Sequence, residues 1–181
     1  MKIRHALQQA IQKLEQSASM NPRLDAETLL MHVLRRERAY LYAHPELELG
    51  CGELTRYSEA ITARASGMPV QYITGHQEFW GLDFKVSPAV LIPRPETEHS
   101  VEMVLEIAGT LRSHPLRIVD VGTGSGCIAI ALASELPQAE IHAIDISAEA
   151  LNLAQENAGR LGFAERISFW QGDLLLPFSG A

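Results

Sequence analysis

One stretch decides the fold of this chain: Ile118-Val119-Asp120-Val121-Gly122-Thr123-Gly124-Ser125-Gly126. An apolar run holds an acidic residue near its end, and three glycines then alternate with small hydroxyl residues. A helix-like segment, Cys127 to Leu136, follows at once. This order predicts a buried strand, a tight turn built from residues with little or no side chain, and a helix N-terminus. That is the layout of a nucleotide-type cofactor site.

The glycine spacing indicates the class of cofactor. A dinucleotide fingerprint has glycines at its first, third and sixth positions, whereas this loop has them at the first, third and fifth, with Cys127 in the sixth place. A phosphate-binding P-loop is excluded because no lysine follows the last glycine. The loop offers close backbone approach but no basic residue for a phosphate. We therefore predict S-adenosyl-L-methionine, a phosphate-free adenosyl cofactor, as the ligand of Gly122, Thr123, Gly124, Ser125 and Gly126.

Downstream of Leu116 the pattern alternates between strands and helices, which predicts right-handed βαβ units and a parallel sheet. The expected strands and helices are, in chain order, Arg117–Val121, Cys127–Glu135, Glu140–Ile144, Ala148–Leu161 and Ile167–Trp170. The fold class is thus α/β, a Rossmann-like domain that stops after its third strand. Because the fourth strand of such a sheet is missing, we expect the first strand to be an uncovered edge and the chain to be a fragment of a longer protein.

Two acidic residues follow the later strands of this sheet. Asp145 ends the second strand, 19 residues past Gly126, which is close to the interval expected for the carboxylate that binds a ribose diol. The alternative, an N-cap for the next helix, is a role that Ser147 can fill. Asp173 follows the third strand at the same edge of the sheet, where it can accept from an adenine amine or serve as a turn residue. We predict both carboxylates as cofactor-binding residues.

Two further residues flank the loop. Asp120 is expected to hold either the backbone N–H groups of the loop or the ammonium of the ligand. Cys127 begins the helix, where its pKa is expected to be somewhat depressed. No histidine lies near it in the sequence, so we interpret Cys127 as a packing residue and not as a nucleophile.

The front half of the chain has helical periodicity. Asn21-Pro22 predicts an N-cap and a first helical residue, and other helices are expected near residues 3–14, 38–43 and 54–65. Residues 77–86 change to a period typical of a β-hairpin, and Pro88, Pro93 and Pro95 enforce an extended path. We expect a helical substrate-recognition domain over residues 1–75, a hairpin and proline-rich linker over 76–95, and a partial methyltransferase domain over 96–181.

The composition restricts the class of protein. The net charge of −7 argues against a nucleic-acid binder, and no apolar run reaches membrane-spanning length. The charge is uneven, since residues 1–75 carry nine Lys and Arg against eight Asp and Glu and the rest carry six against fourteen. Two cysteines far apart and histidines without ligand spacing predict a cytoplasmic protein without a disulfide framework or a metal.

Four segments together resemble one protein family. They are Pro69–Gly75 (PVQYITG), Glu78–Phe84 (EFWGLDF), Leu91–Glu98 (LIPRPETE) and the loop Asp120–Gly126 (DVGTGSG). The chain resembles the HemK-type protein-(glutamine-N5) methyltransferases, which modify the glutamine of the Gly-Gly-Gln motif in peptide chain release factors. The glycine loop marks only a methyltransferase. The run Ile-Pro-Arg-Pro-Glu-Thr-Glu favours the release-factor branch over the related enzymes that methylate a ribosomal protein.

The resemblance implies a helical recognition domain, a hairpin linker and a catalytic domain whose glycine loop, Asp145 and Asp173 bind S-adenosylmethionine. It also implies release factors as protein substrates, and we expect a monomer that binds neither nucleic acid nor membrane. The family's Asn-Pro-Pro-Tyr motif, which positions the glutamine amide, is not found among these 181 residues. No catalytic residue is therefore assigned, and we expect the fragment itself to be inactive.

Two other functions remain open from the sequence. A dinucleotide-dependent oxidoreductase is disfavoured by the glycine spacing. A non-catalytic module that binds a release factor through its helices, with a vestigial cofactor fold, is disfavoured by the intact glycine loop and by Asp145.

Overall fold

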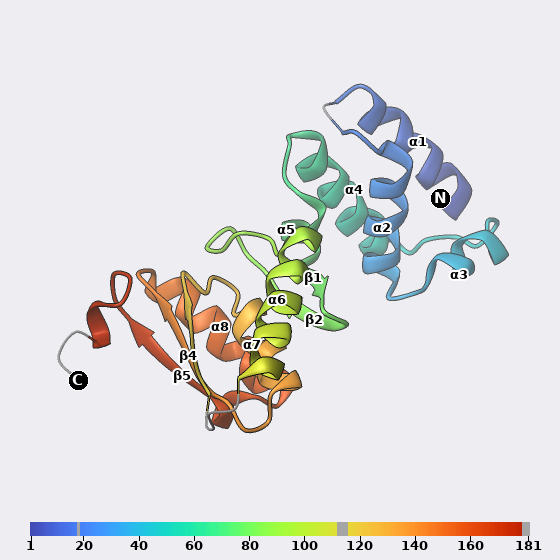
Figure 1. Ribbon diagram of the computed structural model, residues 1–181. Coiled ribbons are helices and arrows are strands. Elements are labelled where there is room, and N and C mark those ends of the chain that lie inside the picture. The colour runs from blue at the N-terminus through green and yellow to red at the C-terminus, as the bar shows by residue number, and fades with distance from the viewer. Residues whose placement is uncertain (18, 112–115, 179–181) are drawn as a thin grey trace. The chain divides into compact units, whose positions relative to one another are not determined.

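A computed structural model describes residues 1–17, 19–111 and 116–178. It divides the chain into two compact units, one from Met1 to Thr74 and the other from Gly75 onward, which are described separately below. The first unit is helical, and the second contains both sheets (Figure 1). Among the described residues, no helix combines the length and the apolar character needed to cross a membrane.

The first unit consists of α1 (Ile3–Glu15), α2 (Pro22–Leu34), α3 (Arg38–Ala43), α4 (Cys51–Ala65) and the short α5 (Val70–Thr74). Its core is formed by apolar side chains at helical spacing on α1, α2 and α4, including Ile3, Leu14, Leu29, Leu30 and Ile61. The predicted start of α2 is confirmed, with Pro22 at the first helical position and Asn21 before it. The Asn21 side chain, however, makes no capping hydrogen bond.

Glu27 of α2 is a buried carboxylate that pairs with Arg38 of α3. Glu27 is only 2% exposed, and Arg38 donates to its Oε2 from Nε and Nη2, both at 2.7 Å. Tyr42 donates to Oε1 at 2.5 Å. Arg38 therefore compensates a buried charge, which would otherwise be strongly destabilising.

The second unit begins with the predicted β-hairpin, β1 (His76–Phe79) and β2 (Leu82–Lys85), paired antiparallel. Its two turn residues, Trp80 and Gly81, have φ of 55° and 69°, as two-residue hairpin turns require. The turn is supported by Glu98, whose Oε1 accepts from the Trp80 backbone N–H at 2.8 Å. Glu98 begins α6 (Glu98–Thr110), directly after the 3₁₀ turn η1 (Pro95–Thr97). Glu98, the last residue of the Pro93–Glu98 run, thus supports the hairpin.

Three parallel strands follow, β3 (Arg117–Val121), β4 (Glu140–Asp145) and β5 (Ile167–Gln171), in the order β3-β4-β5. The connecting helices are α7 (Cys127–Glu135) and α8 (Ala148–Leu161), and the 3₁₀ turns η2 (Ala164–Arg166) and η3 (Leu176–Phe178) precede and follow β5. The predicted βαβαβ order is confirmed. Within the described residues β3 is an edge strand, as expected, and its Val121 is 41% exposed.

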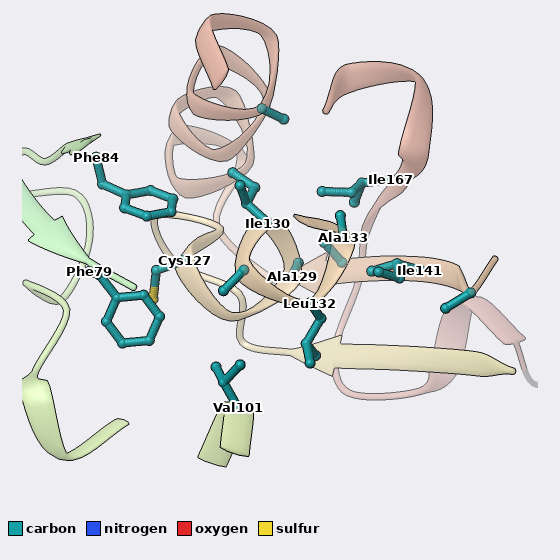
Figure 2. Packing of buried hydrophobic residues seen from close by; sticks show 14 residues of the cluster. Phe79, Phe84, Val101, Cys127, Ala129, Ile130, Leu132, Ala133, Ile141 and Ile167 are labelled. Atoms are coloured by element: carbon teal, nitrogen blue, oxygen red, sulfur yellow. The ribbon is translucent and has the colours of Figure 1, made fainter. Parts of the chain in front are cut away.

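The core of the second unit surrounds α7. The side chains of Ala129, Ile130 and Leu132 are buried at 1% exposure or less. Figure 2 shows Phe79 and Phe84 of the hairpin on one side of this helix and Ile141 and Ile167 of the sheet on the other. Burying each such large apolar side chain contributes about 1.5–3 kcal/mol. This packing holds the N-terminus of α7, and with it the glycine loop, against the carboxyl ends of the strands.

Candidate functional site

The loop between β3 and α7 has a conformation that only glycine adopts without strain. Gly122, Gly124 and Gly126 have φ of 78°, 57° and 81°. For residues with a Cβ this region costs roughly 1–2 kcal/mol per residue. The alternating glycines therefore follow from the backbone path itself.

The loop is fixed to the neighbouring strand through one carbonyl. Ile144 O, in β4, accepts from the N–H groups of Gly122 and Thr123 at 2.8 and 2.9 Å. Gly126 N–H then donates to Thr123 O at 2.8 Å and closes the turn before α7 begins. The loop therefore lies at the carboxyl end of β4.

Asp145, the last residue of β4, contacts this loop directly. Its Oδ2 accepts from the Gly124 N–H at 2.9 Å and its Oδ1 from the Ser147 N–H at 3.0 Å. Ser147 provides the N-cap of α8 as expected, accepting from the Ala150 N–H at 3.2 Å. A carboxylate oxygen has more than one lone pair, so both oxygens can also accept from a diol.

Asp120 supports the loop from its other end. Its Oδ2 accepts from the Thr123 hydroxyl at 2.7 Å and from the Ala129 N–H at 3.3 Å. Asp120 was expected to hold backbone N–H groups of the loop or the ammonium of the ligand; it instead holds the loop through the Thr123 hydroxyl, and the backbone N–H that it accepts from lies in the first turn of α7. Burial raises the pKa of its carboxyl group.

Asp173 lies at the same edge of the sheet but on the exposed surface. The link between its segment and the loop region is a backbone one, since Gly172 N–H donates to Asp145 O at 3.1 Å. The next residue, Leu174, has a positive φ of 48° and is 66% exposed. The structure thus brings Asp145 into contact with the glycine loop, whereas Asp173 lies exposed on the surface.

Three residues near the loop were not predicted from the sequence. Ile146 directly follows Asp145 and is 69% exposed, an apolar side chain at the edge where the candidate ligand would lie. Val90 of the proline-rich segment approaches Gly124, with its Cβ 4.0 Å from the position of a Cβ on that glycine. Asn157 of α8 bonds to Ser125 O at 2.9 Å. Of these three, only Ile146 could have been found from the local sequence, because it is an apolar residue directly after the acidic residue that ends a strand.

The expected depression of the Cys127 pKa is wrong. Burial raises the pKa of this thiol to about 11, because the side chain lies in the apolar core with Phe79 and Val101. Its position at the helix start does not compensate for the loss of water. The interpretation as a packing residue agrees with this environment.

The residues at this edge fit an adenosyl cofactor. The position of a Cβ on Gly122 meets open space, so a ligand can approach the backbone there. The buried Ser125 hydroxyl, beside the Cys127 thiol, has no hydrogen-bond partner of normal geometry within the described residues. Asp145 supplies acceptors for a diol, and exposed apolar side chains such as Ile146 can contact a base. Two hollows of about 720 and 770 Å³ lie in the helical unit, and none of these residues lines them.

Comparisons with known proteins agree with this architecture. Residues 5–75 match the family of the PrmC N-terminal domain, and residues 113–179 match a methyltransferase domain family. The chain is 54% identical over 175 residues to a release factor glutamine methyltransferase of Koribacter versatilis, covering 97% of the chain and 61% of that relative. It is 49% identical over 180 residues to the enzyme of that name in Moorella thermoacetica, covering 99% of the chain and 63% of the relative.

A solved RNA methyltransferase of Salinibacter ruber, in complex with S-adenosyl-L-homocysteine, is 30% identical with a TM-score of 0.39, covering 47% of this chain and 52% of its own. The chain spans about three fifths of the length of the curated relatives named above.

The fold and the family match define the class: residues 113–179 match a methyltransferase domain family, which together with the βαβαβ order confirms the predicted Rossmann-like fold class and agrees with the predicted cofactor, S-adenosyl-L-methionine. Residues 5–75 before it match the PrmC N-terminal domain family, and the chain is similar along nearly its whole length to release factor glutamine methyltransferases. The resemblance read from its four segments is thereby confirmed.

Gly126→Ala should destabilise the second unit more than Gly122→Ala. A Cβ on Gly126 would lie 3.1 Å from the Cβ of Ala154 and 3.2 Å from Ile130 Cδ1, whereas Gly122 has nothing within 4 Å. Both variants carry the cost of a positive φ, about 1 kcal/mol, and Gly126→Ala adds overpacking of about 1–2 kcal/mol. Urea unfolding without ligand measures the difference, and equal costs would contradict the packing role of Gly126.

Cys51 and Cys127 should react very differently with a thiol reagent. Cys51 is exposed, whereas Cys127 is buried with a pKa of about 11, so little thiolate is present at pH 8. In the native chain at pH 8 we expect rapid labelling of Cys51 alone, and of both thiols after denaturation. Mass spectrometry of the labelled peptides distinguishes them; native labelling of Cys127 at a comparable rate would overturn its assignment to the core.

Proposed function

We propose that the edge formed by Gly122–Gly126, Asp145 and Asp173 binds S-adenosylmethionine. The observation that carries this proposal is the contact between the Gly124 N–H and Asp145 Oδ2 at 2.9 Å. It holds a backbone loop without side-chain bulk beside a carboxylate that can accept from a ribose. Bound S-adenosylmethionine would supply an electrophilic methyl group on its sulfonium.

We further propose that the whole protein transfers this methyl group to the side-chain amide nitrogen of the glutamine in the Gly-Gly-Gln motif of release factors. Support comes from the similarity to release factor glutamine methyltransferases and from the LIPRPETE segment, Leu91–Glu98. In the resembled family an Asn-Pro-Pro-Tyr motif accepts both hydrogens of that amide and so points its lone pair at the methyl group. Such catalysis depends mainly on positioning.

The similarity to release factor glutamine methyltransferases also supports a separate role for each part of this chain. Residues 1–75 recognise the release factor, residues 76–95 link the units, and residues 96–181 hold the methyl donor. The protein acts in the cytoplasm, as a monomer, on a protein substrate.

Asp145→Ala should weaken binding of S-adenosylmethionine by about tenfold to a hundredfold, the range expected for a lost hydrogen bond to a charged group. The loss has two causes, removal of a diol acceptor and release of the Gly124 N–H. Isothermal titration calorimetry of the native chain measures the affinity. Glu149→Ala is the matched control, since it removes the same charge from the exposed first turn of α8.

Unchanged affinity in Asp145→Ala would contradict the proposed ribose role. Tighter binding of NAD than of S-adenosylmethionine by the unaltered chain would favour the oxidoreductase alternative.

Residues 1–181 alone should bind the cofactor yet transfer little or no methyl to a release factor, because the amide-positioning motif is not among them. Incubation with radiolabelled S-adenosylmethionine and a purified release factor measures the transfer. Robust labelling of the Gly-Gly-Gln glutamine would show that this chain positions the amide by other residues.

A further inference from the structure

Asn157 of α8 is a fully buried polar residue whose side-chain amide joins two segments far from it in the sequence. Its Oδ1 accepts from the Lys85 backbone N–H at 2.8 Å. Its Nδ2 donates to Lys85 O at 3.0 Å and to Ser125 O at 2.9 Å. Both amide hydrogens and the oxygen are therefore used, with one partner in strand β2 and the other in the glycine loop.

The hairpin leaves the backbone groups of Lys85 available for this contact. In an antiparallel pair, hydrogen-bonded and non-hydrogen-bonded residues alternate. Val86 N–H bonds across to Gly75 O at 2.9 Å, so the preceding residue, Lys85, points its N–H and C=O away from β1. The amide of Asn157 takes the place that a third strand would occupy.

The other contact of Asn157 joins α8 to the glycine loop. Ser125 is 2% exposed, and its carbonyl is held by Asn157 Nδ2. The adjacent Gly126 packs on Ala154, one turn earlier in α8. Gly122, Thr123 and Gly124 of the same loop donate to Ile144 O and Asp145 Oδ2 in β4. α8 therefore fixes the loop through contacts separate from those made by Ile144 and Asp145.

We propose that Asn157 is a positioning residue for the cofactor loop, which it holds in its binding conformation by tying Ser125 to strand β2. This inference rests on the proposed binding of S-adenosylmethionine at that loop. The hairpin thereby becomes part of the support of the site, although it contributes none of the predicted ligand contacts.

Asn157→Asp separates the two contacts with almost no change in side-chain volume. The carboxylate can still accept from the Lys85 N–H, but it cannot donate to Ser125 O or Lys85 O and places negative charge beside both carbonyls. We expect the Lys85 amide to remain protected from hydrogen exchange and the Gly126 amide to exchange at least about tenfold faster, as its turn loosens. Binding of S-adenosylmethionine should weaken by about tenfold, the factor for one lost hydrogen bond.

Arg160→Ala is the matched control on the same helix. Arg160 also ties α8 to β2, since it donates to the backbone carbonyl of Asp83 and, at 3.1 Å, to its carboxylate. Within the described residues, the hydrogen bonds of its side chain all go to Asp83 and none reaches the loop. We expect this variant to loosen the hairpin while leaving Gly126 exchange and cofactor affinity within about twofold of the parent.

Exchange is followed by NMR and affinity by calorimetry, on variants shown to be folded by circular dichroism. Should Asn157→Asp fail to fold, the smaller, uncharged Asn157→Ser replaces it. Unchanged Gly126 exchange in the Asn157 variant, or an equal effect of Arg160→Ala, would overturn the proposal.

If the parent chain bound no S-adenosylmethionine, the proposed function would fail, whereas the exchange of Gly126, measured without ligand, would still decide the role of Asn157.

Discussion

The site depends on one backbone group, the carbonyl of Ile144, which accepts from both Gly122 and Thr123. Two consecutive N–H groups can reach one carbonyl only if the chain turns sharply after β3, and that turn requires the positive φ values of the loop glycines. With the loop fixed there, α7 begins directly after it at Cys127, and the carboxylate of Asp145 accepts a hydrogen bond from the Gly124 N–H. The spacing of the glycines is therefore required by the turn from β3 into α7, and not only by the need for a ligand to come close to the backbone.

Other residues of the second unit also hold the glycine loop in place. Asp120 holds Thr123 and the first turn of α7, while α8 supports the loop through Ala154 and Asn157. The apolar core around α7 keeps these elements together. Loop, strand ends and hairpin thus form one connected frame within this unit, in which the exposed edge of Asp145 and Ile146 is the part open to a ligand.

Local sequence predicted much of this. The bounds of α7, α8 and β3 were predicted as found, because an apolar run, a glycine turn and a helix cap each act over a few residues. Long-range packing could not be predicted in that way. The pKa of Cys127 is raised by burial in a core to which hairpin phenylalanines over 40 residues away contribute, and Asn157 bonds to Lys85, 72 residues earlier. The short helix α5, which follows Pro69, was missed because residues 70–74 have too few turns to show a period.

The central claim is that the carboxyl edge of the β3-β4-β5 sheet binds an adenosyl cofactor. The most direct measurement is a ¹H–¹⁵N correlation spectrum of the chain titrated with S-adenosylhomocysteine. The account predicts that the largest amide shifts fall on Gly122–Gly126, on Asp145 and Ile146, and on Gly172 and Asp173. Shifts confined to the helical unit, or none in the glycine loop at saturating ligand, would contradict it.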